Sequence, residues 1–203
     1  MSKTEIKICG MINEADIEAV NEYKPEYVGF VLFFPKSKRN IDIEKAKELS
    51  KGLNANIKKV AVVVSPTIEQ VIQISGAGFD YIQIHGEMPS EISSDSSIPI
   101  IKAFNVSDLD NYEKYVSMDC IKGFVFDANE PGSGKTFDWN MLNSMPKTSK
   151  LCFLSGGLSA DNVNAAIDFV HPDVVDISSN VEYADRPGKD PEKIRKFIEA
   201  VRN

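Results

Sequence analysis

A cysteine that closes a short apolar segment is the first residue in this chain whose type and position could support catalysis. The segment reads Glu5-Ile6-Lys7-Ile8-Cys9. A thiol suits general-base chemistry because its pKa, about 8.5, lies near neutrality and cationic neighbours lower it. In a strand, Lys7 and Cys9 would share a face, which places a positive charge near the sulfur. The alternative is that Cys9 packs as a small buried hydrophobe.

Two charged residues further along the chain could complement a base at Cys9. Asp127 ends the apolar segment Gly123-Phe124-Val125-Phe126, and a carboxyl group there could act as a general acid if burial raises its pKa. Arg39 could hold a substrate carboxylate through a two-pronged hydrogen bond. The alternatives are that Asp127 caps a loop and that Arg39 belongs to a solvated basic loop.

Two loops near the C-terminus have the composition of a phosphate site. Residues 155–159 read Ser-Gly-Gly-Leu-Ser, and residues 177–182 read Ile-Ser-Ser-Asn-Val-Glu. Glycine lets backbone N–H groups approach an anion, although both loops could instead be ordinary helix-capping turns. We expect a phosphate group to contact four residues: Gly156, Gly157, Ser178 and Ser179. Asp176 would share a strand face with Ser178 and point into the same site, or it would only fix a neighbouring loop.

Other polar motifs are less informative. Gln83 and His85 would also share a strand face, and we expect a structural role for both because a lone histidine supports no metal site. The segment Gly132-Ser133-Gly134-Lys135-Thr136 resembles a nucleotide-binding P-loop, but the first glycine of that motif would fall on Asn129. We therefore interpret this segment as a glycine-rich flap rather than a nucleotide site.

The elements that must position these residues follow a regular spacing. Apolar, β-branched segments typical of buried parallel strands occur at Ile6–Cys9, Tyr27–Leu32, Val60–Val64, Tyr81–Ile84, Ile98–Ala103, Ile121–Phe126, Leu151–Leu154 and Val174–Ile177. Helical spacing follows the capping residues Asn13, Asp42, Thr67, Ser107, Ser159 and Asp190. Residues 88–97 would hold at most a short helix. The pattern predicts a (β/α)₈ TIM barrel, an α/β fold, over residues 1–203 as a single domain. A doubly wound open sheet is the alternative, but no GxGxxG follows the first strand.

Composition narrows the class of partner. The 203 residues carry a net charge of −7 without long blocks of like charge, which argues against nucleic acid. No apolar segment is long enough to span a membrane, and no signal peptide is evident. Three widely spaced cysteines form neither a disulfide framework nor a zinc pattern, so we expect no metal and a reducing, cytoplasmic location. Because barrel active sites lie at the C-terminal ends of the strands, the candidate residues should meet there.

Taken together, the motifs resemble the phosphoribosylanthranilate isomerase family of tryptophan biosynthesis. The matching segments, in family order, are Lys7–Gly10, Tyr27–Phe30, Ser37–Arg39, Gln83–Gly86, Phe126–Asp127, Gly132–Trp139, Ser155–Leu158 with Asn162–Val163, and Val175–Ser179. The resemblance covers nearly the whole chain. It implies a (β/α)₈ barrel, a small phosphorylated substrate and no cofactor, and it leaves monomer and homodimer open.

The resemblance also implies residue roles. The family carries out an Amadori rearrangement of N-(5-phosphoribosyl)anthranilate. By this resemblance Asp127 would be the general acid, Cys9 the general base, and Arg39 would bind the anthranilate carboxylate. Two departures are that Asn180 replaces the usual glycine and that Pro131 precedes Gly132. Other phosphosugar barrels, such as indole-glycerol-phosphate synthases or pentose-phosphate epimerases, and an inactive barrel that senses phosphorylated metabolites, are the competing interpretations.

Overall fold

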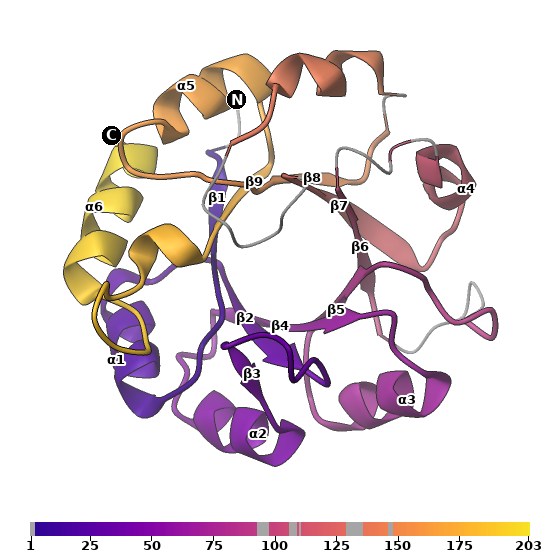
Figure 1. Cartoon of the computed structure of the whole chain (residues 1–203), viewed down its shortest axis with the longest axis horizontal. Helices are drawn as coiled ribbons and strands as arrows, with labels where there is room; N and C mark the ends of the chain where they lie inside the picture. The colour runs from indigo at the N-terminus through magenta and orange to yellow at the C-terminus, as the bar shows by residue number, and fades with distance from the viewer. Residues whose placement is uncertain (1–2, 93–97, 106–108, 110, 129–135, 146–147) are drawn as a thin grey trace.

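One parallel sheet organises the part of the chain that the structure describes. The structure, a computed structural model, describes residues 3–92, 98–105, 109, 111–128, 136–145 and 148–203. The strands are β1 (Glu5–Cys9), β2 (Tyr27–Leu32), β3 (Asn40–Ile41), β4 (Lys58–Val64), β5 (Tyr81–His85), β6 (Ile100–Asn105), β7 (Ile121–Asp127), β8 (Leu151–Leu154) and β9 (Val174–Ile177). Their order is β1-β9-β8-β7-β6-β5-β4-β2-β3, and β1 also pairs with β2. That last pairing closes the sheet into the ring that Figure 1 shows.

The barrel predicted from the spacing is confirmed. β2, β8 and β9 have the predicted bounds, whereas β6 begins two residues later than predicted and extends to Asn105. The two-residue β3 was not predicted, because it lies at the edge of β2 and is too short to show a period. Eight of the strands therefore form the closed barrel, and their C-terminal ends meet at one rim.

Helices cover the outside of the ring (Figure 1). They are α1 (Glu14–Tyr23), α2 (Ile43–Lys51), α3 (Ile68–Gly76), α4 (Tyr112–Val116), α5 (Val163–Val170) and α6 (Pro191–Arg202), with 3₁₀ turns η2 (Trp139–Ser144) and η3 (Ser179–Val181). The side chains of four residues cap helices as predicted: Asn13, Asp42, Thr67 and Asp190. At α5 the N-cap position belongs to Asn162, three residues after Ser159. α4 begins at Tyr112, later than predicted, and Ser107 lies outside the described residues.

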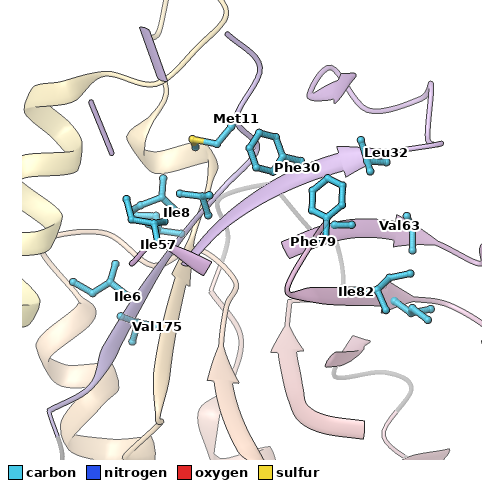
Figure 2. Close-up of a cluster of buried hydrophobic side chains, with 14 of the residues drawn as sticks. Ile6, Ile8, Met11, Phe30, Leu32, Ile57, Val63, Phe79, Ile82 and Val175 are labelled. Carbon is cyan, nitrogen blue, oxygen red and sulfur yellow. The ribbon is translucent and has the colours of Figure 1, made fainter. Parts of the chain in front are cut away.

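Apolar side chains form two separate layers. The outer layer fills the space between strands and helices, and its members include Ile6, Ile8, Phe30, Ile82 and Val175 (Figure 2). The inner layer fills the barrel with side chains of the opposite strand face: Cys9, Tyr27, Val31, Val60, Val62, Ile101, Ala103, Val125, Phe153 and Val174. The strands are thus buried on both faces, as their continuous apolar runs predict. Within the described residues, no helix is long and apolar enough to cross a membrane.

Candidate active site

A cavity of about 490 Å³ opens at the C-terminal ends of the strands. All eight residues that the sequence nominated line it: Cys9, Arg39, Asp127, Gly156, Gly157, Asp176, Ser178 and Ser179. They come from five different strand ends and are separated by up to 170 positions in the chain. The closed parallel barrel brings them together because every strand delivers its C-terminal residue to the same rim.

Cys9 ends β1 beside a buried ion pair. Lys7, on the same strand face, is fully buried, and its Nζ donates to Asp176 Oδ2 at 2.6 Å. Burial acts to lower the pKa of Lys7, but the Asp176 carboxylate and the Cys9 sulfur outweigh it and raise that pKa. Gly29 of β2 leaves the space that the thiol occupies, since a Cβ there would lie 2.7 Å from Cys9 Sγ.

The thiol does not have the depressed pKa that its position next to a lysine suggested. Burial raises the pKa of Cys9 above its ordinary value, and the positive charge of Lys7 offsets this only in part. The reason is that the packing which buries Cys9 beside Lys7 also removes the water that would stabilise a thiolate. The thiol form of Cys9 is therefore favoured near neutral pH.

Asp127 ends β7 on the same cavity. Burial, reinforced by the negative charge of Asp176, raises the pKa of Asp127 to about 6. Its Oδ1 accepts from the N–H of Ala128 at 2.8 Å, which fixes the carboxyl group at the rim. Gly156 packs against this turn with a φ of +86°, and a Cβ at that position would lie 2.7 Å from the Ala128 nitrogen. Only glycine fits there, so the loop at residues 155–159 packs closely against the Asp127 turn.

Arg39 belongs to a cluster of charges rather than to a solvated loop. Its side chain is 14% exposed, and Nε donates to Glu182 Oε1 at 2.5 Å. Glu182 also binds Lys38 at 2.7 Å and the fully buried Lys189 at 3.2 Å. Burial acts to raise the pKa of Glu182, but Arg39 and the two lysines lower it to about 2, so it stays ionised. Among the described residues, the buried Nη2 of Arg39 has no hydrogen-bond partner.

The second loop, residues 177–182, is hydrogen-bonded to the end of β1. Ser178 Oγ donates to the carbonyl of Cys9 at 2.8 Å, so this hydroxyl is engaged within the protein. Asn180, which stands where the family usually has glycine, lies in η3 and does not have a positive φ. Its Nδ2 donates to the Leu158 carbonyl at 2.8 Å and links the two loops. The substitution therefore requires no left-handed backbone.

Sequence reasoning missed Glu182 and Lys189 as parts of the site. Glu182 lies in the motif after β9, but its contact with Arg39 spans 143 positions. Lys189 follows a Pro-Gly pair, a context in which the sequence does not distinguish a buried lysine from an exposed one. Its Nζ donates to the Ser178 carbonyl at 3.1 Å. Residues 129–135 lie outside the described residues, and they include Pro131 and all of the expected flap except Thr136. No group of three metal-ligating side chains occurs in the part that is described.

Comparison with known proteins identifies one enzyme family. The family model described as N-(5'phosphoribosyl)anthranilate (PRA) isomerase matches residues 6–200. The chain is 40% identical over 201 residues to N-(5'-phosphoribosyl)anthranilate isomerase of Listeria monocytogenes, with 97% of this chain and 98% of the relative covered. It is 42% identical to the enzyme of Clostridium acetobutylicum over 205 residues, with 98% of each covered.

Solved structures of the same enzyme have the same fold. Phosphoribosyl anthranilate isomerase of Thermotoga maritima superimposes with a TM-score of 0.85 at 36% identity over 98% of each chain. A second structure is a complex of the isomerase with reduced 1-(o-carboxyphenylamino)-1-deoxyribulose 5-phosphate, and it superimposes with a TM-score of 0.82 at 33% identity, again over 98% of each chain. With its fold, its full-length relatives and its family match in agreement, this chain belongs to the phosphoribosylanthranilate isomerase family of tryptophan biosynthesis.

Proposed function

We propose that this enzyme converts N-(5-phosphoribosyl)anthranilate to 1-(2-carboxyphenylamino)-1-deoxyribulose 5-phosphate with Asp127 as general acid and Cys9 as general base. The observation that carries these roles is that both side chains line one cavity at strand ends, with the buried ammonium group of Lys7 beside the Cys9 sulfur and a raised carboxyl pKa at Asp127. A carboxyl pKa of about 6 leaves a proton available near neutrality, which an ordinary aspartate would have lost. An intramolecular rearrangement needs one donor and one acceptor of protons, and the form with Asp127 protonated and Cys9 ionised supplies one of each.

The steps balance without an external reactant. Asp127 gives its proton to the ring oxygen as the bond from that oxygen to C1′ breaks, and the nitrogen lone pair forms the Schiff base. Cys9 then takes the proton from C2′, and the electron pair moves through C1′ to neutralise the iminium nitrogen. The resulting enolamine becomes the ketone when the Cys9 thiol returns its proton to C1′ and the hydroxyl at C2′ gives its proton to the Asp127 carboxylate, which restores both groups. Substrate and product contain the same atoms.

Lys7 supports the base in this scheme. Burial favours the protonated thiol, so turnover needs a minor form in which Cys9 has lost its proton while Asp127 holds one. A buried ammonium group stabilises a nearby thiolate strongly because little water screens the charge. The ion pair with Asp176 keeps Lys7 in place and charged. Lys7 thus raises the population of the active form.

The two anionic ends of the substrate match two parts of the cavity. The free Nη2 of Arg39 supports binding of the anthranilate carboxylate, since Glu182 occupies only Nε. Gly156 and Gly157, with φ values of +86° and +65°, give the first loop the open backbone that a phosphate dianion requires. Binding would fix the substrate at both ends, with the reacting carbons between them.

Fluorescence tests the activity directly. The substrate can be generated in situ, and its anthranilate signal should disappear only when the enzyme is added, with the ketose product appearing in equal amount. Inorganic phosphate should compete weakly. Gly157→Ala should weaken that competition because the strained backbone displaces N–H groups from the anion. Gly78→Ala is the matched control, since Gly78 has a similar φ of +79° and lies outside the cavity lining. Persistence of the substrate signal would overturn the proposal.

A further inference from the structure

Gln83 and His85 of β5 occupy the cavity without a role in the scheme above. Strand alternation directs both to the barrel interior, while Ile82 and Ile84 pack in the outer layer. Gln83 is 2% exposed. Its Nε2 lies 2.8 Å from Nε2 of His85. The remaining amide oxygen, Oε1, is buried and has no hydrogen-bond partner among the described residues.

The contact with His85 engages the amide nitrogen of Gln83 and leaves the amide oxygen for a ligand. Burial lowers the pKa of His85 to about 3, and the nearby charges of Lys102 and Lys7 add to this shift. The ring is therefore neutral, and in the tautomer that carries the proton on Nδ1 its Nε2 accepts a hydrogen bond from the Gln83 amide. A buried acceptor without a partner costs free energy, which a bound donor would recover.

The end of β5 is built rigidly around this pair. The His85 carbonyl accepts from the N–H of Ser65 at 2.8 Å. Gly86 follows with a φ of +66°, and a Cβ there would lie 2.4 Å from Ser65 Oγ. Ser65 itself has a φ of +43°, which is strained for a residue with a side chain. Such strain persists only where the surrounding contacts hold the backbone in one conformation.

We propose that Gln83 is a specificity-determining residue whose Oε1 accepts a hydrogen bond from a sugar hydroxyl of the substrate, and that His85 is the positioning residue that holds the amide in this orientation. The substrate chemistry selects the hydroxyl group. Phosphate and carboxylate oxygens only accept, and the amine N–H of an anthranilate is already bonded to its own ortho carboxylate. The sugar hydroxyls are the donors that remain.

This inference rests on the proposed function, and a binding cycle separates the two. The probes are the reduced open-chain product analogue and three versions of it that lack the hydroxyl at carbon 2, 3 or 4. Gln83→Met keeps the length of the side chain and removes the acceptor. It should weaken binding of the parent analogue about 3- to 10-fold, as expected for one neutral hydrogen bond. For one deoxy analogue the variant and the wild type should bind equally.

The controls cover folding and orientation. Gln73→Met makes the same exchange on the exposed surface of α3 and should leave all four dissociation constants unchanged. His85→Phe removes the acceptor for the amide, so the difference between wild type and Gln83→Met should shrink in that background, and His85→Gln should restore it. Equal losses for all four probes in Gln83→Met, or no loss at all, would overturn the role of Gln83. Failure of the wild type to bind the parent analogue would overturn the proposed function as well.

Discussion

Two charged clusters border the cavity and differ in exposure and in balance. The pair Lys7–Asp176 is closed off from water, with side chains 0% and 5% exposed, and its two charges cancel. The second cluster consists of Lys38, Arg39, Lys189 and Glu182, in which three cationic side chains share one carboxylate. The first arrangement can tune a neighbouring thiol, whereas the second has positive charge left for an anionic ligand.

This difference teaches how one barrel rim separates chemistry from binding. A fully buried pair acts at short range, and breaking it leaves an uncompensated charge in a dry environment. A cluster that reaches solvent through Lys38, 72% exposed, can accommodate a ligand without such a cost. Changes on the side of Cys9 and Asp127 should therefore affect kcat, and changes in the second cluster should affect KM.

The largest expected effect is at the base. Cys9→Ser should lower kcat by about 10⁴-fold, the upper end of what a positioned base contributes, because a hydroxyl group does not ionise near neutrality. Binding of the reduced product analogue should stay within a few-fold of the wild type. Cys152→Ser, in β8 and away from this cavity, is the matched control and should retain activity. Steady-state kinetics of both variants test this, and a Cys9→Ser enzyme with near-normal kcat would exclude the thiol as base.

Asp127→Asn should lower kcat by about 10³-fold, because the amide has no proton to donate to the ring oxygen. It should also stabilise the fold at pH 8 by at most about 3 kcal/mol, from a shift of about two pKa units. A carboxyl pKa raised to about 6 contributes stability that is present at low pH and lost as the pH rises through 6. Urea unfolding of both proteins should therefore show a gain at pH 8 that disappears towards pH 4.

The same pKa values predict the pH profile of the wild type. The active form carries one proton on Asp127 and none on Cys9, although the order of their pKa values favours the reverse. The acidic limb of kcat/KM should therefore follow the ionisation near pH 6, and the basic limb should follow the thiol, above its ordinary range. Carbon-13 NMR of the Asp127 carboxyl group checks the first value, and titration near pH 4 would contradict the burial argument.

Lys7→Met should lower kcat about 100-fold, since loss of the ammonium group raises the pKa of the Cys9 thiol further and depletes the thiolate. It should also destabilise the protein by about 3 kcal/mol or more, because Asp176 is left buried without its partner. The double variant Lys7→Met/Asp176→Asn should recover much of the stability but not the activity. Recovery of both would assign the pair a purely structural role.

The smallest effect should arise in the second cluster. Arg39→Ala should raise KM about 30-fold with little change in kcat, the loss expected for a charge-assisted hydrogen bond. Arg39→Lys should restore only part of it, because an ammonium group cannot contact Glu182 and a carboxylate through a planar fork. Lys36→Ala, in the same basic segment, serves as the control. A large loss of kcat in Arg39→Ala would place this arginine with the reacting groups.

The sequence by itself determined the barrel and the membership of the rim. Continuous apolar strands such as Tyr27–Leu32, alternating with helices that Asn13 or Thr67 cap, leave few folds open, because these signals are local. Cys9 and Asp127 could be nominated because each polar side chain ends an apolar strand. The start of α4 was predicted too early, because this helix has only five residues and its apolar pattern is too short to define a boundary.

Only the tertiary structure decided the electrostatics of the site. The sequence places Lys7 beside Cys9 and suggests an acidic thiol, but desolvation depends on every layer packed around the strand end and reverses that expectation. Glu182 acquires its role through a contact with Arg39, 143 positions away. Gln83 is marked out by its burial and by an amide oxygen that has no partner among the described residues. Local patterns fix which side chains a strand delivers to the rim. Burial and long-range charge, which no local pattern contains, fix what those side chains can do there.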